Sequence, residues 1–230
     1  MHESEIKQQM LNPVMKKIFF ITGFVALVMT LCLFPPLLSE KVSPEACRAA
    51  YAALDAYRRN NPQEEPRFLA IVDYSKPSCV KRMAIEELST GKRTHYLVAH
   101  GKRSGELHAR RFSDTPESNM SSLGLFKVLN TYSGDHGTAL RLEGLEPERN
   151  GNAFVRDIVL HSADYVSAHY ILLNFVTLQG PRIGRSNGCF VVSREKIGEV
   201  AEKLGSGGFV YAWAKETGET KKPDPTTPLQ

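Results

Sequence analysis

Short apolar runs separated by turn-forming residues extend from residue 67 to residue 214, and they constrain the fold most strongly. Each run is rich in Val, Ile, Leu or aromatic residues and is bounded by residues such as Gly, Pro, Asn, Asp or Ser, as β-strands are. The runs are RFLAIVDYS, CVKRMAIEEL, THYLVAHG, LFKVLNTYSG, TALRLEG, AFVRDIVLHS and GFVYAW. A mainly β domain with few helices is therefore expected over residues 67–214.

Two helices are expected around these runs. Residues 43–66 begin with Ser43 as an N-cap and Pro44 in the first turn, continue with helical apolar spacing, and end in a connector. A second helix is expected after a Ser193 cap, with Gly205 as its end. The segment FSDTPESNMSSLG is rich in turn formers and predicts a long surface loop, while residues 215–230 predict a disordered tail.

The N-terminal part contains one long apolar stretch. Lys16 and Lys17 precede residues 18–39, which are uncharged up to Glu40 and long enough to cross a bilayer. Lysines on that side predict a cytoplasmic segment over residues 1–17 and an exported remainder, in the periplasm or its equivalent. A signal anchor is favoured over a cleaved signal peptide, because no small-x-small cleavage site follows. The net charge of +4 includes no long basic block, so nucleic acid is not an expected partner.

The four cysteines differ in their surroundings. Cys32 lies in the apolar stretch, whereas Cys47, Cys79 and Cys189 would face an oxidising compartment. Three exported thiols leave one without a partner, which suggests a Cys47–Cys79 disulfide with Cys189 free. That Cys47 and Cys79 are instead buried thiols is equally compatible with the sequence, since spacing does not reveal spatial distance.

Cys189 stands at the end of the stretch GRSNGCFVV, and it could be structural or nucleophilic. Gly188 allows a sharp turn that can aim backbone N–H groups at one point, and Arg185 could lower the pKa of the thiol or hold a carboxylate. His161, at the end of an apolar run, is the best candidate base, and His136 could line the same cleft. His169 is interpreted as a partly buried helix residue. Taken alone, Cys189 fits a structural thiol better.

Two other chemistries are not expected. Zinc ligands commonly occur in pairs such as C-x-x-C or H-x-x-x-H, and neither pair is present, so no metal or other cofactor is predicted. A serine-hydrolase nucleophile elbow is not expected either.

GRSNGCFVV together with IVLHSADYVS resembles the signature of the L,D-transpeptidases, the YkuD-like cell-wall enzymes. DYSKPS, VAHGKRSG, FSDTPESNMSSLG and DHGTALRLEGLEP extend the similarity to the murein L,D-transpeptidase subfamily, over roughly Phe68 to Tyr211. The resemblance implies a β-sandwich or barrel-like catalytic domain, here preceded by one N-terminal transmembrane helix. It also implies peptidoglycan stem peptides as partners.

In the mechanism that the resemblance implies, the Cys189 thiolate attacks the L-centre of diaminopimelate in a tetrapeptide stem, and D-alanine leaves. His161 is the implied base, oriented by the main-chain carbonyl of Ser162, and the N–H groups of Gly188 and Cys189 would hold the oxyanion. An amine of a second stem would then form a 3→3 cross-link. Alternatives are an L,D-carboxypeptidase, a stem-peptide-to-protein transferase, and an inactive peptidoglycan-binding domain. The expected substrate-binding residues are Arg185, Ser186, Asn187 and His136.

The sequence departs from the family pattern at several positions. Asn187 stands where the wider family usually has His and the subfamily Trp, and Phe190 stands where the subfamily usually has Pro. Ser162 replaces a common Gly, and the chain between His161 and Ser186 is longer than usual. The insertion YILLNFVTLQGP is expected to reshape a lid over the cleft. These departures concern substrate and acceptor choice more than the chemistry.

Overall fold

The structure, a computed structural model, describes residues 13, 15–24, 42–134, 137–205 and 207–215. The chain divides into two compact units, Met1–Ser39 and Glu40–Gln230. In the first unit, residues 15–24 are helical. Within the described part of the chain, no helix is both long and apolar enough to cross a membrane. The predicted span over residues 18–39 falls largely on residues 25–39, which lie outside the described residues.

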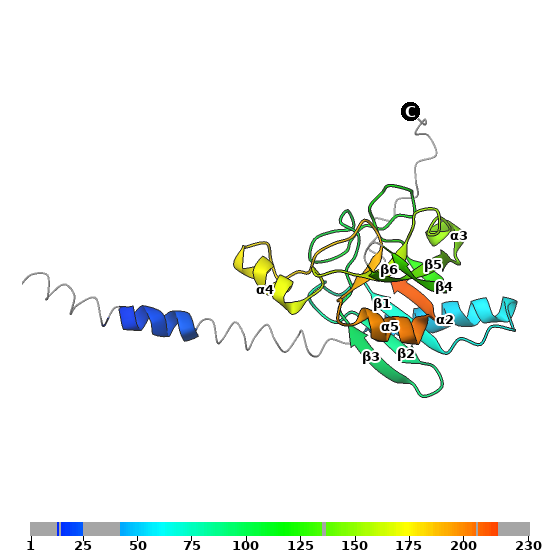
Figure 1. The fold of residues 1–230 in the computed structure, drawn as a ribbon, viewed down its shortest axis with the longest axis horizontal. Coiled ribbons are helices and arrows are strands. Elements are labelled where there is room, and N and C mark those ends of the chain that lie inside the picture. The colour runs from blue at the N-terminus through cyan, green and yellow to red at the C-terminus, as the bar shows by residue number, and fades with distance from the viewer. Residues whose placement is uncertain (1–12, 14, 25–41, 135–136, 206, 216–230) are drawn as a thin grey trace, which may run out of the picture. The chain divides into compact units, whose positions relative to one another are not determined.

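The second unit is built on one sheet of eight strands, as the succession of short runs predicts (Figure 1). The strand order is β3-β2-β1-β8-β4-β5-β6-β7, with parallel pairs β1–β8 and β6–β7. The strands are β1 Phe68–Asp73, β2 Met83–Glu87, β3 Lys92–Tyr96, β4 Gly124–Gly134, β5 Gly137–Gly144, β6 Val159–Ser162, β7 Phe190–Val192 and β8 Phe209–Trp213. The helices of this unit are α2 Pro44–Asn60, α3 Pro147–Asn150, α4 Ala168–Val176 and α5 Ile197–Leu204.

The sheet curls until its two ends meet. The chain that leaves β3 reaches β7 at the opposite edge, where the Ala99 N–H donates to the Val191 carbonyl at 2.8 Å. A second bridge joins Gly101 to Ser186. The result is a nearly closed, barrel-like sheet in which the segment after β3 covers the outer edge of β7.

Both faces of the sheet carry apolar residues, because helices cover the outer face. Along β1, Ala70 and Val72 belong to the inner cluster, while Leu69 and Ile71 belong to a cluster shared with α2. Alternation of side chains along a strand explains why β1 is apolar at nearly every position. Both clusters consist of residues between 42 and 214, so the unit Glu40–Gln230 contains its complete described core and we expect it to fold by itself.

Helix α2 begins as the sequence predicts. The Ser43 hydroxyl accepts from the Ala46 N–H at 3.3 Å, and Pro44 occupies the first turn. The expectation for α5 is wrong at its start: the helix begins at Ile197 after Lys196, because residues 193–196 form a separate turn closed by the Lys196 N–H on the Ser193 carbonyl. The run predicted over residues 153–162 is also shortened, since the residues before Val159 form turns around Asn150 and Arg156.

Cys47, Cys79 and Cys189 are each present without a disulfide bond. Of the two interpretations that the sequence left open, the structure therefore has separate thiols at Cys47 and Cys79. Cys47 lies on the buried face of α2, where its sulfur accepts a hydrogen bond from Arg93 at 3.5 Å.

Candidate functional site

The register of β6 and β7 brings His161 and Cys189 to the same face of the sheet. His161 lies opposite Val191 in the parallel pair, and Cys189 is two residues before Val191. The intervening residues Leu160 and Phe190 point into the inner core. Because side chains alternate along strands, His161 and Cys189 share the opposite face and are diagonal neighbours across the pair.

The His161 ring is held by the main chain of the next residue. Its Nδ1 lies 3.1 Å from the Ser162 carbonyl oxygen, and both residues are buried. A carbonyl oxygen can only accept, so Nδ1 carries the proton and donates it. In a neutral imidazole this leaves the lone pair on Nε2, and such a nitrogen can accept a proton.

The Cys189 thiol is enclosed by the turn that precedes β6. Its sulfur lies 3.4 Å from the Asp157 carbonyl oxygen and donates to it. Asp157 has a φ of 50°, a left-handed conformation that Asp tolerates better than most residues and that re-aims the chain before the strand. Burial raises the pKa of the Cys189 thiol, while the Val159 N–H and the Arg156 charge oppose that rise. In the unliganded protein the thiol is therefore the resting form.

The loop before Cys189 is closed by the Ser186 hydroxyl. This hydroxyl donates to the Cys189 carbonyl at 2.7 Å and accepts from the Gly188 N–H at 3.1 Å. Gly188 has a φ of 130°, and a Cβ there would lie 2.9 Å from the Met120 carbonyl oxygen, so only glycine fits. An oxyanion at this site would compete with Ser186 for the Gly188 N–H.

The segment GRSNG does contain the G-x-S-x-G spacing, which the sequence interpretation overlooked. A nucleophile elbow, however, joins a strand to a helix and exposes its serine. Here the segment leads into β7, and Ser186 is buried with its hydroxyl engaged in the loop. Ser186 is therefore a positioning residue and not a nucleophile.

A buried arginine supports this loop from behind. Arg82 is fully buried, donates twice to the Val98 carbonyl, and donates to His100 Nδ1 at 2.7 Å. Burial and the adjacent Arg82 lower the pKa of His100 to about 3, which keeps its ring neutral. The His100 main-chain carbonyl in turn accepts from the Ser186 N–H at 3.0 Å. The Cys189 loop is thus fixed to the rigid strand continuation after β3.

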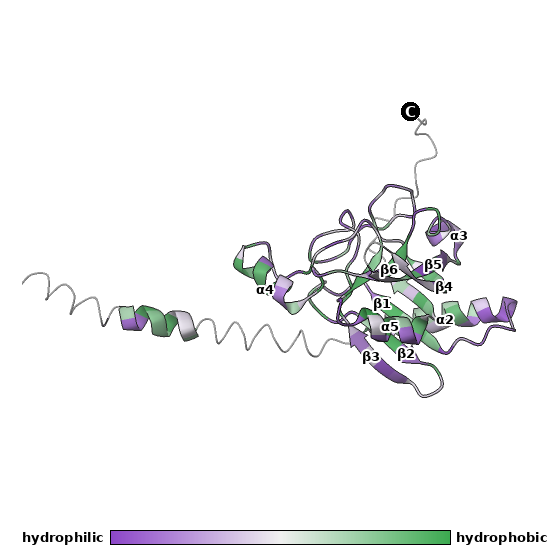
Figure 2. Cartoon of the chain, viewed as in Figure 1, coloured by the Kyte–Doolittle hydropathy of each residue, from purple (hydrophilic) through white to green (hydrophobic). Residues whose placement is uncertain are grey.

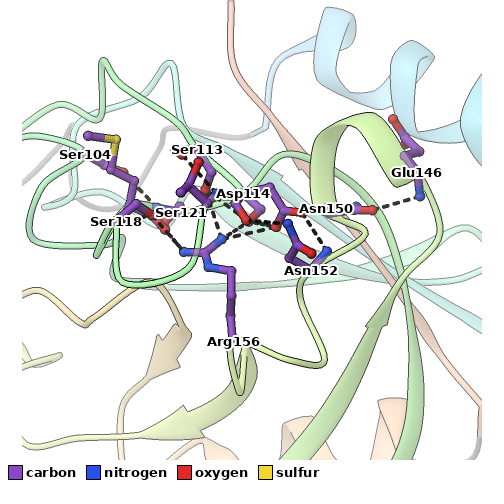
Figure 3. Close-up of polar contacts among 12 residues, drawn as sticks. Ser104, Ser113, Asp114, Ser118, Ser121, Glu146, Asn150, Asn152 and Arg156 are labelled. Atoms are coloured by element: carbon purple, nitrogen blue, oxygen red, sulfur yellow. Dashed lines mark hydrogen bonds and ion pairs between the residues drawn. The ribbon is translucent and has the colours of Figure 1, made fainter. Parts of the chain in front are cut away.

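A second arginine fixes the long loop beside the site. Figure 3 shows the Arg156 guanidinium pointing into the loop of residues 112–123, where it binds Asp114 and serines of that loop. Nη1 donates to Asp114 Oδ1 at 3.2 Å and to Ser122 Oγ at 2.5 Å, and Nη2 donates to the Met120 carbonyl at 2.7 Å. Asp114 also accepts from the Asn152 N–H at 2.6 Å. The same guanidinium lies beside Gly188, where a Cβ would come within 3.2 Å of Nη2, and its charge acts on the Cys189 thiol. The sequence interpretation missed Arg156.

A model of the L,D-transpeptidase catalytic domain matches residues 38–213, which is most of the chain. The chain belongs to the L,D-transpeptidase catalytic domain family. No curated protein matches it in sequence.

Two solved structures are similar to this L,D-transpeptidase domain. One is an L,D-transpeptidase from Mycobacterium smegmatis, with 12% identity and a TM-score of 0.38, covering 64% of this chain and 59% of that one. The other is the L,D-transpeptidase (residues 123–326) from Xylanimonas cellulosilytica DSM 15894, with 17% identity and a TM-score of 0.36, covering 71% and 68%. The chain thus spans about three fifths of the Mycobacterium protein.

The other predicted site residues of this L,D-transpeptidase domain lie in different surroundings. Arg185 binds Glu106 and the Lys102 and Gly105 carbonyls, and the charge acting on the Cys189 thiol comes instead from Arg156. Asn187 is exposed at the loop tip. His136 lies outside the described residues.

The sequence analysis of this L,D-transpeptidase domain also singled out Phe190 and His169. Phe190 is buried and packs on Tyr74 and Phe126, with ring centroids 6.4 and 5.3 Å apart, so it fills the barrel core. His169, expected to be partly buried, is exposed on α4, which projects from the sheet.

Among the described residues, no group of three His, Cys, Asp or Glu side chains could hold a metal ion.

The raised pKa of the Cys189 thiol predicts slow alkylation near neutral pH. Because burial favours the neutral thiol, the thiolate is populated only above the pH at which an exposed cysteine ionises. Iodoacetamide labelling of the native chain, followed by peptide mass mapping, should show the rate at Cys189 still rising where the unfolded chain has reached its plateau. A profile that matches the unfolded chain would contradict this expectation.

Proposed function

We propose that this chain is a peptidoglycan L,D-transpeptidase in which Cys189 is the nucleophile and His161 the base. The observation that carries the proposal is the pairing of β6 with β7, which puts both side chains on one face while Ser162 leaves His161 Nε2 unprotonated. Membership of the L,D-transpeptidase family supplies the reaction class. The substrate follows from the resemblance: a tetrapeptide stem with diaminopimelate at its third position.

In the proposed reaction, the Cys189 sulfur attacks the carbonyl carbon of the L-centre while His161 Nε2 takes the thiol proton. Collapse of the tetrahedral intermediate breaks the C–N bond, and His161 returns the proton to the departing D-alanine amine. The resulting thioester is attacked by the amine of a second stem, which forms a 3→3 amide and restores the thiol. The N–H groups of Cys189 and Gly188 stabilise the oxyanion once substrate displaces the Ser186 hydroxyl from Gly188.

The partial burial of Cys189 suits this scheme. The raised pKa keeps the thiol neutral before attack, so proton transfer to His161 is coupled to attack and needs no standing thiolate. The positive Arg156 beside the loop lowers the cost of the developing negative charge on sulfur.

We also propose that residues 18–39 anchor the chain in the inner membrane, with the catalytic unit in the periplasm. Lys16 and Lys17 before the apolar stretch favour that orientation. A cleaved, secreted form is the alternative. Protease digestion of spheroplasts distinguishes an exposed, membrane-bound catalytic unit from a released one.

Asn187 and the insertion that contains α4 depart from the family pattern, and these departures concern acceptor choice. A second candidate is therefore an acyl acceptor other than a stem amine. Water as the acceptor would give an L,D-carboxypeptidase, and a protein amine would give a stem-peptide-to-protein transferase. Incubation with tetrapeptide muropeptides separates these outcomes. Dimers indicate transpeptidation, whereas tripeptides without dimers indicate hydrolysis.

Replacing His161 by Ala tests the base. We expect folding to be retained and acylation of Cys189 to slow by about 10²- to 10⁴-fold, the usual contribution of a general base. Intact-mass analysis during incubation with a carbapenem follows the covalent adduct, and His169→Ala, an exposed histidine, is the matched control. Equal acylation rates in the two variants would remove His161 from the mechanism. A folded native chain that forms no adduct would favour an inactive peptidoglycan-binding domain.

A further inference from the structure

Helix α4 and the turn after it present an apolar surface that no described residue covers. The fractional exposures are 60% for Leu172, 49% for Leu173, 69% for Val176 and 94% for Leu178. Figure 2 shows this apolar helix projecting away from the sheet. Leu178 also has a φ of 61°, a conformation that is unfavourable for Leu. An exposed Leu in this conformation indicates a surface that binds an apolar partner.

The apolar surface carries no charged side chain, whereas the segment beside its base is basic. No Asp, Glu, Lys or Arg occurs from Tyr165 to Pro181. At the base of the projection, the segment of residues 102–111 meets the chain that follows α4: Arg185 donates to the Lys102 carbonyl at 3.1 Å, and Arg182 pairs with Glu106 at 3.4 Å. Apart from Glu106, this segment has only basic charges, and these residues are exposed: Lys102, Arg103, Arg110 and Arg111.

We propose that α4 and residues 102–111 form a membrane-docking face that inserts Leu172, Leu173, Val176 and Leu178 into the interfacial region of an anionic lipid bilayer. An uncharged apolar tip bordered by Lys and Arg is the pattern by which interfacial helices bind such lipids. The tip enters the boundary between headgroups and acyl chains, while the basic side chains lie at the level of the phosphates.

The charge pattern of the face supports a bilayer as the occupant. Apolar side chains favour the acyl boundary and Lys and Arg favour anionic headgroups, so the two parts of this face match the two layers of the lipid interface. This match depends on the composition of the face and not on the proposed anchor.

Docking would orient the catalytic site. Helix α4 lies in the chain between His161 on β6 and the Gly184–Cys189 loop, so the segment that inserts is continuous with both. The cleft would then be held at the membrane side of the cell wall.

Vesicle binding by residues 40–230, which lack the proposed anchor but retain the complete described core, tests the docking face. Vesicles of phosphatidylethanolamine with phosphatidylglycerol should co-sediment the protein, and phosphatidylcholine vesicles should do so much more weakly. Leu172→Glu should abolish binding, while Leu129→Glu, at an exposed leucine on β4, should not. Reversal of Lys102 and Arg103 to Glu should weaken binding by at least about fivefold per residue, and the matched reversal of the exposed Arg58 and Arg59 on α2 should not.

Leu178→Gly separates binding from folding. Glycine is favoured at a φ of 61°, so this variant should keep or raise the thermal midpoint while it weakens vesicle binding. Absence of vesicle binding by the native unit would overturn the proposal. So would a dimer in sedimentation velocity that Leu172→Glu dissociates, because α4 would then bind a second copy. No substrate is used, so either failure leaves the proposed transpeptidase activity untouched.

Discussion

Replacing Cys189 by Ala is expected to reduce acyl transfer by about 10⁴-fold or more, because the proposed reaction has no step that bypasses the sulfur. The fold should be retained, since the sulfur donates only a weak hydrogen bond to the Asp157 carbonyl, at 3.4 Å. Muropeptide product analysis measures the loss, and circular dichroism with thermal unfolding checks the fold.

Cys79→Ala is the matched control for this expectation. Cys79 is another partly exposed cysteine outside any disulfide, and it has no place in the proposed reaction. Its variant should form product and carbapenem adduct at the native rate. Product formation by Cys189→Ala at more than a small fraction of the native rate would contradict a cysteine mechanism and indicate another nucleophile.

Replacing Arg156 by Ala is expected to destabilise the unit by about 3–5 kcal/mol, the usual cost of removing one partner of a buried ion pair. The Arg156 and Asp114 side chains are only 3% and 11% exposed, so Asp114 would remain as a buried carboxylate without its arginine. The loop of residues 112–123 would also lose its donors to Ser113, Ser118, Met120 and Ser122. Urea denaturation of the native and Arg156→Ala proteins measures the difference in the free energy of unfolding.

Arg48→Ala provides the comparison for Arg156→Ala. Arg48 pairs with Glu45 on the surface of α2, with exposures of 70% and 57%, so its loss should cost at most about 1 kcal/mol. Arg156→Lys keeps the charge but loses the forked geometry, and we expect an intermediate value. If Arg156→Ala were no more destabilising than Arg48→Ala, the loop would have to be held by other contacts.

Arg156→Gln, the uncharged variant of similar size, should also move alkylation of Cys189 to higher pH. The positive charge of Arg156 opposes the rise in the pKa of the thiol, so its loss lets burial raise that pKa further. A loop that merely loosened would expose the thiol and speed labelling at every pH, which distinguishes the electrostatic role from a structural one.

Much of the fold follows from local patterns. The runs that gave β1, β2, β3 and β8 are short, apolar and bounded by turn residues, and each became a strand. The Ser43 cap of α2 is equally local, since it involves residues three positions apart. The errors occur where tertiary contacts compete with local preference: residues before Val159 form turns that carry Arg156 to its loop, and the turn after Ser193 delays the start of α5.

The candidate site is less evident from local patterns. GRSNGCFVV and IVLHSADYVS point to Cys189 and His161 through a family resemblance, and family membership is now shown over residues 38–213. The sequence alone suggested Ser186 and Arg185 as substrate ligands. In the structure the Ser186 hydroxyl is bound inside the loop, and Arg185 forms an ion pair with Glu106. Their hydrogen bonds involve partners that no local pattern specifies.

By itself, the sequence predicted most strands along the chain, the α2 cap, the family, and Cys189 and His161 as the residues most suited to the chemistry, because these depend on neighbours along the chain. Only the tertiary structure decided that Arg156 lies beside Cys189, that Arg82 and His100 support its loop, and that α4 stands exposed. Arg156 and Asp114 are 42 residues apart in the chain. Contacts of this range depend on which strands pair, and in which register, and therefore on the closure of the whole sheet.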